Sequence, residues 1–249
     1  MRPCQFHSRL RLPGCPVSNS KIRVALVDDQ PLFAAGLRML IDAQPDMLSV
    51  AVATDGVGAV DIAASGVADV MLMDLRMPRL NGLRAIEQIV AEHGDRAPAI
   101  IVLTTIAKDE ATFEALRAGA QNFLTKDAAP AVVITAIRQA RLDVGVLRNA
   151  ETRKLLDLYA VQTREAVPKL ESRLTARERE VVHLVARGLA NNEIAAAMGI
   201  SEATTKTHVR SILTKLDLRN RVQIAILAFE SGLIRVPTAS HLSSGAESS

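Results

Sequence analysis

Residues 70–82 read VMLMDLRMPRLNG, a run of four apolar residues that ends at Asp74 and is followed by Pro78 and Gly82. A continuous apolar run of this kind, closed by proline and glycine, is typical of a strand that is buried on both faces of a parallel sheet. A carboxylate at the end of such a strand is either a solvated loop residue or part of a site. The residues that share its edge of the sheet decide between the two.

The composition is that of a globular protein with room for two domains. The chain has 249 residues, of which 49% are hydrophobic and 23% charged. Only 2% are aromatic, which argues against a protein that works mainly by stacking nucleic-acid bases. No apolar stretch reaches the roughly 18 residues needed to cross a bilayer, so no membrane partner is expected. Cys4 and Cys15 are the only cysteines, which favours a reducing, cytoplasmic location.

Charge is divided unevenly along the chain. Residues 21–143 hold 12 Lys and Arg against 16 Asp and Glu, a formal charge of −4. Residues 173–236 hold 10 against 6, a formal charge of +4. An acidic front and a basic back predict two domains with different partners. We therefore expect domains at 21–143 and 173–236, a partly helical linker at 144–172, and disordered segments at 1–20 and 237–249.

Strand-like and helix-like segments alternate through the front domain. The expected strands are 22–27, 47–53, 69–73, 98–104 and 121–125. The expected helices are 31–43, 57–66, 82–93, 109–119 and 128–143. Strands that alternate with helices of about ten residues or more predict an α/β fold, here a doubly wound, five-stranded parallel sheet covered on both faces.

Polar residues follow four of the predicted strands. The residues are Asp28 and Asp29 after the first strand, Asp74 at the third, Thr104 at the fourth and Lys126 at the fifth. Ligands of doubly wound sheets bind beyond the carboxyl ends of the strands, so these side chains should converge. Three carboxylates repel one another unless a cation lies among them, and oxygen ligands suit Mg²⁺ or Mn²⁺. An aspartate that attacks phosphorus needs such a metal, together with a hydroxyl and an ammonium for the phosphoryl oxygens.

Here the sequence resembles the receiver domain of bacterial two-component response regulators, over residues 22–142. The resemblance rests on VDDQP, MDLRMPRLNG, VLTT and FLTKD, in this order along the chain. It implies that Asp74 accepts a phosphoryl group from a sensor histidine kinase. It also implies that Asp28, Asp29 and Asp74, with the main-chain carbonyl of Arg76, hold the metal ion.

The same resemblance implies roles for three further residues. Thr104 would be the switch hydroxyl, and Lys126 the lysine that binds the phosphoryl group. Phe123 stands where many members of the family have a switch aromatic residue, often tyrosine. Because Phe123 lacks the hydroxyl, switching through it would occur by packing. The segment QNFLTKD also departs from the commoner Gly-Phe/Tyr-Leu-Leu-Lys run at Asn122 and Thr125.

A second motif in the front domain suggests a different ligand. TDGVGAVD (54–61) places Gly56 and Gly58 between a strand and a helix, as in a dinucleotide-binding loop. However, Asp61 occupies the place of the third glycine, and the motif follows the second strand rather than the first. We therefore interpret the two glycines as turn residues.

The back domain has the pattern of a helix-turn-helix. Thr175 and Glu178 form a capping box at the start of a first helix. A short helix then ends at Gly199, and Ser201 begins a longer one, EATTKTHVRSILTKL. Basic and small polar residues near the start of that helix suit a DNA major groove. Periodicity alone leaves open a small helical bundle with a solvated basic face.

The motifs of this domain resemble those of LuxR-type helix-turn-helix domains over residues 173–235. The resemblance rests on LTARERE, GLANNEIA, GIS, KTHV and KL, in this order. It implies that three residues face bases, namely Lys206, Thr207 and Arg210. It implies that three others lie nearer the phosphates, namely Thr204, Thr205 and His208. The family usually has valine where Thr205 stands, so this residue either packs or adds a hydroxyl that reaches a phosphate.

Together the two resemblances predict a DNA-binding transcriptional response regulator, with no enzyme activity beyond its own phosphorylation and dephosphorylation. Its expected partners are a sensor histidine kinase, double-stranded DNA, a second copy of the chain when phosphorylated, and RNA polymerase as a further option. A phosphohydrolase or phosphotransferase would need a second carboxylate close after Asp74, where the sequence has Arg76. A small-molecule-sensing LuxR-type regulator would need a ligand-lined pocket in the front domain.

Overall fold

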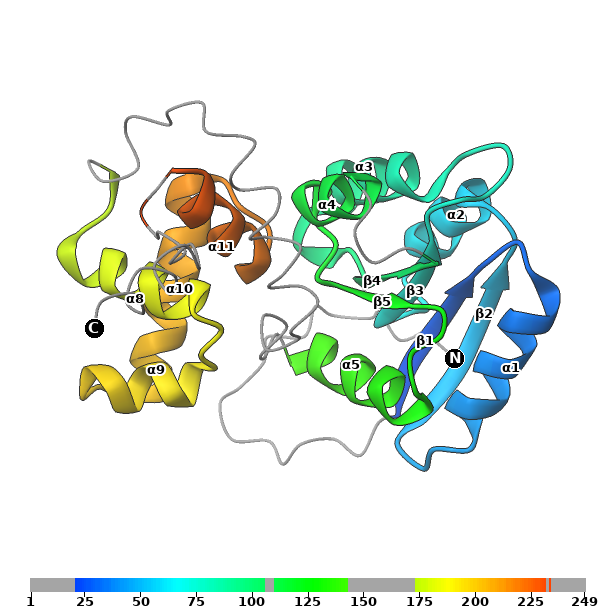
Figure 1. The fold of residues 1–249 in the computed structure, drawn as a ribbon, viewed down its shortest axis with the longest axis horizontal. Coiled ribbons are helices and arrows are strands. Elements are labelled where there is room, and N and C mark those ends of the chain that lie inside the picture. The colour runs from blue at the N-terminus through cyan, green and yellow to red at the C-terminus, as the bar shows by residue number, and fades with distance from the viewer. Residues whose placement is uncertain (1–20, 106–109, 143–172, 232, 234–249) are drawn as a thin grey trace, which may run out of the picture.

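A computed structural model of the chain describes residues 21–105, 110–142, 173–231 and 233. The front half forms a sheet with helices on both faces, and the back half forms a group of helices (Figure 1). We call them the sheet domain (residues 21–142) and the helical domain (residues 173–231). The predicted extension 1–20, linker 144–172 and tail 237–249 lie outside the described residues.

The sheet domain has the predicted α/β architecture. Its strands are β1 (Ile22–Val27), β2 (Met47–Ala53), β3 (Val70–Asp74), β4 (Ala99–Thr104) and β5 (Asn122–Thr125). Its helices are α1 (Pro31–Asp42), α2 (Gly56–Ser65), α3 (Gly82–His93), α4 (Glu110–Ala118) and α5 (Pro130–Leu142), with a 3-10 turn η1 (Gly94–Arg96). All strand pairs are parallel, in the order β2-β1-β3-β4-β5. The prediction of a five-stranded parallel sheet is confirmed.

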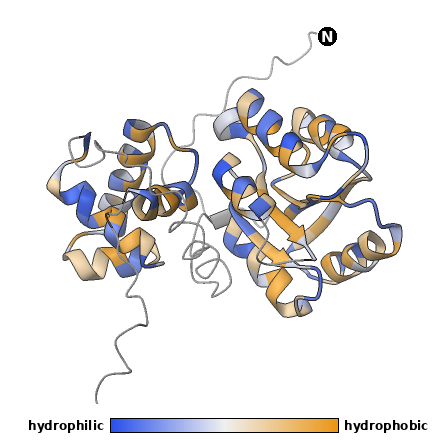
Figure 2. Cartoon of the chain, turned by 45° about the horizontal axis from the view of Figure 1, so that its top comes forward, coloured by the Kyte–Doolittle hydropathy of each residue, from blue (hydrophilic) through white to orange (hydrophobic). Residues whose placement is uncertain are grey.

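The apolar run of residues 70–73 lies in the central strand, β3, and each residue of this strand is buried. Met71 and Met73 pack in the core beneath α2, α3 and α4. Val70 and Leu72 pack in a second core, beneath α1 and α5. Because successive side chains of a strand point to opposite faces, an uninterrupted apolar run is required to fill both cores. Figure 2 shows the resulting hydrophobic sheet inside helices that carry hydrophilic residues on their outer sides.

The helical domain contains α8 (Ala176–Ala186), α9 (Asn191–Met198), α10 (Glu202–Leu216) and α11 (Arg221–Glu230). The capping box between Thr175 and Glu178 is present, and the hydroxyl of Ser201 accepts from the N–H of Thr204 at 3.0 Å. α9 ends at Gly199, whose φ of 65° is the left-handed value that glycine adopts most easily. The predicted helix-turn-helix is therefore formed by α9 and α10. Among the described helices of both domains, none has the length and apolar character needed to cross a membrane.

The two domains meet where α11 lies beside α4 (Figure 1). The side-chain amide of Asn220 donates to the carbonyl of Gly119 at 2.8 Å, and that of Gln223 donates to the carbonyl of Arg117 at 2.6 Å. The guanidinium of Arg117 also lies 3.4 Å from the carboxylate of Glu230. Most of α11 is apolar and buried, as expected of a helix that is covered on more than one side.

Candidate functional site

Three aspartates converge at the carboxyl ends of β1 and β3, as the sequence predicts. Asp28 and Asp29 follow β1, and Asp74 ends β3, the neighbouring strand. One carboxylate oxygen of each lies within 4.8 Å of the others. Asp28 and Asp74 are buried, with 1% and 5% of their surface exposed, whereas Asp29 is exposed. The cluster lies where the strand order reverses, which is the usual position of a ligand site in such sheets.

Lys126 joins this cluster from the end of β5. Its Nζ lies 2.6 Å from Oδ2 of Asp74 and 2.8 Å from Oδ2 of Asp28. It also lies 4.9 Å from the centre of the Phe33 ring on α1, a cation–π contact. Sequence reasoning placed Phe33 in the helix pattern and missed this contact, because nothing in a lone aromatic residue shows which cation it will face.

The ionisation of the cluster reflects its burial. Burial raises the pKa of the Asp28 carboxyl, while Lys126 and the N–H of Gln30 act in the opposite direction. Burial by itself would lower the pKa of Lys126, but hydrogen bonds to Asp28 and Asp74 outweigh it and raise that pKa. Lys126 therefore stays charged, and this one ammonium faces three carboxyl groups, a formal excess of negative charge.

The residues present fit a hard divalent cation. The donors are carboxylate oxygens from three residues, and their excess negative charge in a partly buried site would be relieved by such an ion. The N–H of Arg76 donates to Oδ1 of Asp74 at 3.0 Å, so the main chain of Arg76 lies next to the cluster. Mg²⁺ binds proteins through one or two carboxylates and keeps several waters, which matches a site that is open on the Asp29 side.

Thr104 and Phe123 lie on the strands that complete this edge. Asp74 pairs in register with Leu103, so Thr104 is the next residue along the neighbouring strand. The carbonyl of Thr104 accepts from the N–H of Lys126 at 2.7 Å, which brings the two predicted phosphate-binding residues side by side. Phe123 is fully buried in β5, where it belongs to the core beneath α4.

The alternative dinucleotide motif has a structural explanation. Gly56 and Gly58 lie in the first turn of α2, so they begin a helix where a turn was expected. The N–H of Gly56 donates to the carbonyl of Leu80 at 2.9 Å, and that of Gly58 donates to the Asp55 carboxylate at 2.9 Å. Both donors are used within the protein and do not face outward toward a pyrophosphate.

In the helical domain, α10 presents a polar stripe to solvent. Its exposed residues at helical spacing are Lys206, Thr207, Arg210 and Thr214. The other side of α10 is buried through Val209 and Ile212. Of the residues predicted to lie nearer phosphates, Thr204 is exposed and His208 is partly exposed.

Thr205 does not lie where a phosphate contact would require it. Its exposed surface is 0%, and its hydroxyl donates to the carbonyl of Ser201 at 3.2 Å. The expected phosphate contact is therefore wrong for this residue, because a side chain enclosed by its own domain does not reach DNA. Thr205 instead fills a packing position, with its hydroxyl satisfied by the preceding helical turn.

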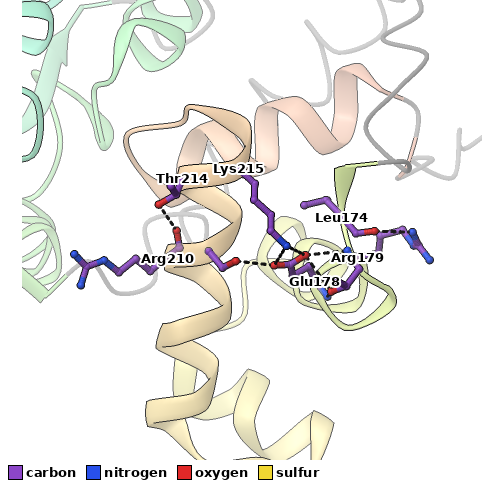
Figure 3. A network of polar contacts seen from close by, with 8 residues as sticks. Leu174, Glu178, Arg179, Arg210, Thr214 and Lys215 are labelled. Carbon is purple, nitrogen blue, oxygen red and sulfur yellow. Dashed lines mark hydrogen bonds and ion pairs between the residues drawn. The ribbon is translucent and has the colours of Figure 1, made fainter.

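A buried carboxylate fixes α10 to α8 (Figure 3). Both oxygens of Glu178 lie 2.7 Å from Nζ of Lys215, and one accepts from the Ser211 hydroxyl at 2.7 Å. Burial acts to raise the pKa of Glu178, but Lys215, the Thr175 N–H and Ser211 outweigh it and lower the value to about 2. Arg210 extends from the opposite side of α10, away from this network. The sequence showed Glu178 only as a cap, because Lys215 is far away along the chain.

Comparison with known proteins agrees with both domains. Residues 24–138 match the family model of the response regulator receiver domain, and residues 172–228 match that of the bacterial regulatory proteins of the luxR family. The uncharacterized transcriptional regulatory protein YxjL of Bacillus subtilis (strain 168) is 37% identical over 220 residues, which are 88% of this chain and 100% of that protein.

Two further comparisons also span most of the chain. The nitrate/nitrite response regulator protein NarL of Escherichia coli (strain K12) is 33% identical over 203 residues, 82% of this chain and 93% of that protein. The crystal structure of the response regulator ChrA of a heme-sensing two-component system is 34% identical, covers 86% of this chain and 100% of that one, and has a TM-score of 0.47. The chain thus belongs to the two-component response regulators, the transcriptional regulators that join a receiver domain to a LuxR-type DNA-binding domain.

Proposed function

We propose that Asp74 is the phosphoacceptor of this regulator. The observation that carries the proposal is the contact of its Oδ2 with Lys126 at 2.6 Å, inside a cluster that holds Asp28 and Asp29. A carboxylate oxygen of Asp74 would form the new bond to phosphorus, while the bond from phosphorus to the phosphohistidine of a sensor kinase breaks. A bound Mg²⁺, or Mn²⁺, would neutralise charge on the phosphoryl oxygens.

The protein's own groups have distinct roles in this reaction. Asp28, Asp29, Asp74 and the carbonyl of Arg76 would hold the ion. The ammonium of Lys126 would bind a phosphoryl oxygen once the new charge displaces its present contacts with the carboxylates. We assign no other enzyme activity to the chain, since Arg76 stands where a phosphotransferase would need a second acid or base.

We propose that α10 enters the major groove of its operator DNA. Lys206, Thr207 and Arg210 are exposed on one side of the helix, and the opposite side is held by the core and by Glu178. Lys and Arg can hydrogen-bond to guanine, and the threonine methyl can contact thymine. Thr204 and His208 would lie nearer the phosphates.

The α4–α11 contact would couple phosphorylation of Asp74 to DNA binding by α10. A phosphoryl group on Asp74 adds charge beside Thr104, which can bond to it by moving inward. Phe123 would then repack beneath α4, and α4 would shift against α11. Release from α4 would leave the helical domain free to pair with that of a second copy, giving a homodimer on DNA.

Phosphotransfer can be tested with acetyl phosphate as donor. With Mg²⁺, intact mass spectrometry should show one added phosphoryl group that is labile to hydroxylamine. EDTA and the Asp74→Asn change should each abolish it, because they remove the metal and the nucleophile. Asp61→Asn, at an exposed position on α2, is the matched control and should be labelled like the parent chain. Full labelling of the Asp74→Asn variant would place the nucleophile elsewhere.

A further inference from the structure

An ion pair joins the loop that connects β3 to α3 to the start of α2. The carboxylate of Asp55 is buried, and its two oxygens have different partners. Oδ1 caps α2 by accepting from the N–H of Gly58 at 2.9 Å. Oδ2 forms an ion pair with the guanidinium of Arg79, which reaches it from the β3–α3 loop. Capping explains the presence of a carboxylate at this position, but it does not explain the arginine.

The backbone conformation of Arg79 indicates that the contact made by its side chain favours arginine at this position. Its φ is 61°, in the left-handed region that residues other than glycine seldom occupy. The surrounding structure must hold a residue in such a conformation. Glycine would adopt it without strain, so an arginine there is favoured only by what its side chain contacts. That contact is a carboxylate from another element, with 2% of its side chain exposed.

The pair restrains the far end of the loop that contains Arg76. At the near end, the N–H of Arg76 donates to Asp74 at 3.0 Å. At the far end, the carbonyl of Leu80 accepts from the N–H of Gly56 at 2.9 Å, directly beside the contact between Asp55 and Arg79. The loop is therefore held between β3 and the start of α2. Its short span leaves the Arg76 carbonyl little freedom while both ends are attached.

We propose that Asp55 and Arg79 are positioning residues for the metal ion: their ion pair holds the β3–α3 loop so that the Arg76 carbonyl faces the ion beside Asp74. The inference rests on the proposed function of Asp74 and deepens it. Neither Asp55 nor Arg79 touches the ion or the phosphoryl group. Mutation of groups that orient metal ligands typically weakens metal affinity about 10- to 100-fold.

The design of the test separates positioning from capping. Asp55→Asn keeps a good cap for α2, because an asparagine side chain also accepts from the N–H of Gly58, but it removes the charge. Arg79→Gly removes the guanidinium and relieves the left-handed backbone, so it should not destabilise the domain. Arg79→Lys keeps a cation within reach of Asp55. Arg84→Gln is the matched control, since Arg84 is equally exposed and ion-paired, with Glu87 on α3.

Binding of Mg²⁺ to the unphosphorylated full-length chain is measured by isothermal titration calorimetry, because the chain has no tryptophan to report binding. Asp55→Asn and Arg79→Gly should each weaken Mg²⁺ binding about threefold or more. The double variant should bind Mg²⁺ no more weakly than the single variant that has the lower affinity. Arg79→Lys should recover part of the affinity, and Arg84→Gln should bind as the parent chain does. Labelling by acetyl phosphate at subsaturating Mg²⁺ should slow in the same order, and saturating Mg²⁺ should restore it.

The outcomes separate this inference from the proposed function. If the parent chain is labelled on Asp74 but Asp55→Asn and Arg79→Gly bind Mg²⁺ like the parent, the ion pair has no positioning role. The same conclusion follows if Arg79→Lys behaves like Arg79→Gly. If Asp74→Asn is labelled and binds Mg²⁺ like the parent chain, the proposed function itself fails.

Discussion

At the residue scale, the geometry around Asp74 depends on a glycine. The N–H of Gly82 donates to the carbonyl of Leu75 at 3.0 Å, which starts α3 directly against the end of β3. A Cβ at this position would lie 2.1 Å from the carbonyl oxygen of Asp74. Main-chain atoms of a central strand cannot easily move away, so any side chain here would push β3 and α3 apart.

Replacement of two glycines by alanine should therefore have opposite effects. Gly82→Ala should destabilise the chain by about 1–3 kcal/mol, the usual effect of overpacking, and should weaken Mg²⁺ binding. Gly36→Ala, within α1, meets nothing within 4 Å and should stabilise the chain by about 0.5–1 kcal/mol through helix propensity. Urea unfolding followed by circular dichroism measures both. Equal stability of the two variants would contradict the close approach between Gly82 and the carbonyl of Asp74.

The residues of the site differ in how well the sequence could predict them. Asp28, Asp74, Thr104 and Lys126 could be predicted because parallel strands bring their carboxyl ends to one edge, so position along the chain implies position in space. Thr205 could not, because a polar residue on a helix gives no sign that its hydroxyl bonds to its own backbone.

At the element scale, the orientation of α10 depends on Glu178. Its pKa is lowered from an ordinary value of 4.5 to about 2, so the stability it contributes is present above pH 4.5 and is lost as the pH falls toward 2. The full shift corresponds to about 3 kcal/mol. Because Lys215 is 40% exposed and water screens the pair, we expect on the order of 1 kcal/mol.

This contribution is measured by comparing urea unfolding at pH 7 and pH 3. Glu178→Gln should lower the stability at pH 7 more than at pH 3, because at pH 3 this carboxyl is already protonated in the unfolded chain, so its charge in the folded chain contributes less. Glu180→Gln is the matched control on the same helix, since the Glu180 side chain is 46% exposed. An equal loss at both pH values would mean that the charge of Glu178 contributes nothing to stability.

The exposed stripe of α10 leads to a second prediction at this scale. If Lys206 or Arg210 reads a base, alanine there should cost about 1–3 kcal/mol of binding to the specific site. A residue that contacts only phosphate would instead weaken all sequences alike and reduce the salt dependence by about one unit. Thr205→Val is the control and should leave DNA affinity unchanged, because Thr205 is buried. Unchanged DNA affinity in both alanine variants would mean that residues outside this stripe read the bases.

At the scale of the whole molecule, the sequence predicted two domains and their types, but it did not predict how they meet. The apolar character of α11 follows from its composition, yet its partner α4 lies about a hundred positions earlier in the chain. Asn220 and Gln223 bond to main-chain carbonyls, and every residue offers such a carbonyl. No pattern in the sequence could therefore indicate Gly119 and Arg117 as their partners.

In the proposed mechanism, phosphorylation of Asp74 controls DNA binding through the α4–α11 contact. Coupling between two sites of a protein is typically about 1–3 kcal/mol, which corresponds to roughly 5- to 150-fold in affinity. Arg117→Gln removes the ion pair with Glu230 and should raise the DNA affinity of the unphosphorylated chain part of the way toward that of the phosphorylated chain. Glu87→Gln, on the exposed side of α3, is a control that should change nothing.

The most direct measurement is fluorescence anisotropy on one operator, with the full-length chain phosphorylated and unphosphorylated, over protein concentrations that span dimerisation. The phosphorylated chain should bind the operator about 5- to 150-fold more tightly than the unphosphorylated chain. Asp74→Asn, treated with the same phosphodonor, should bind like the unphosphorylated chain. Identical affinity of the two forms of the parent chain at every concentration would contradict control of the DNA-binding domain by the receiver.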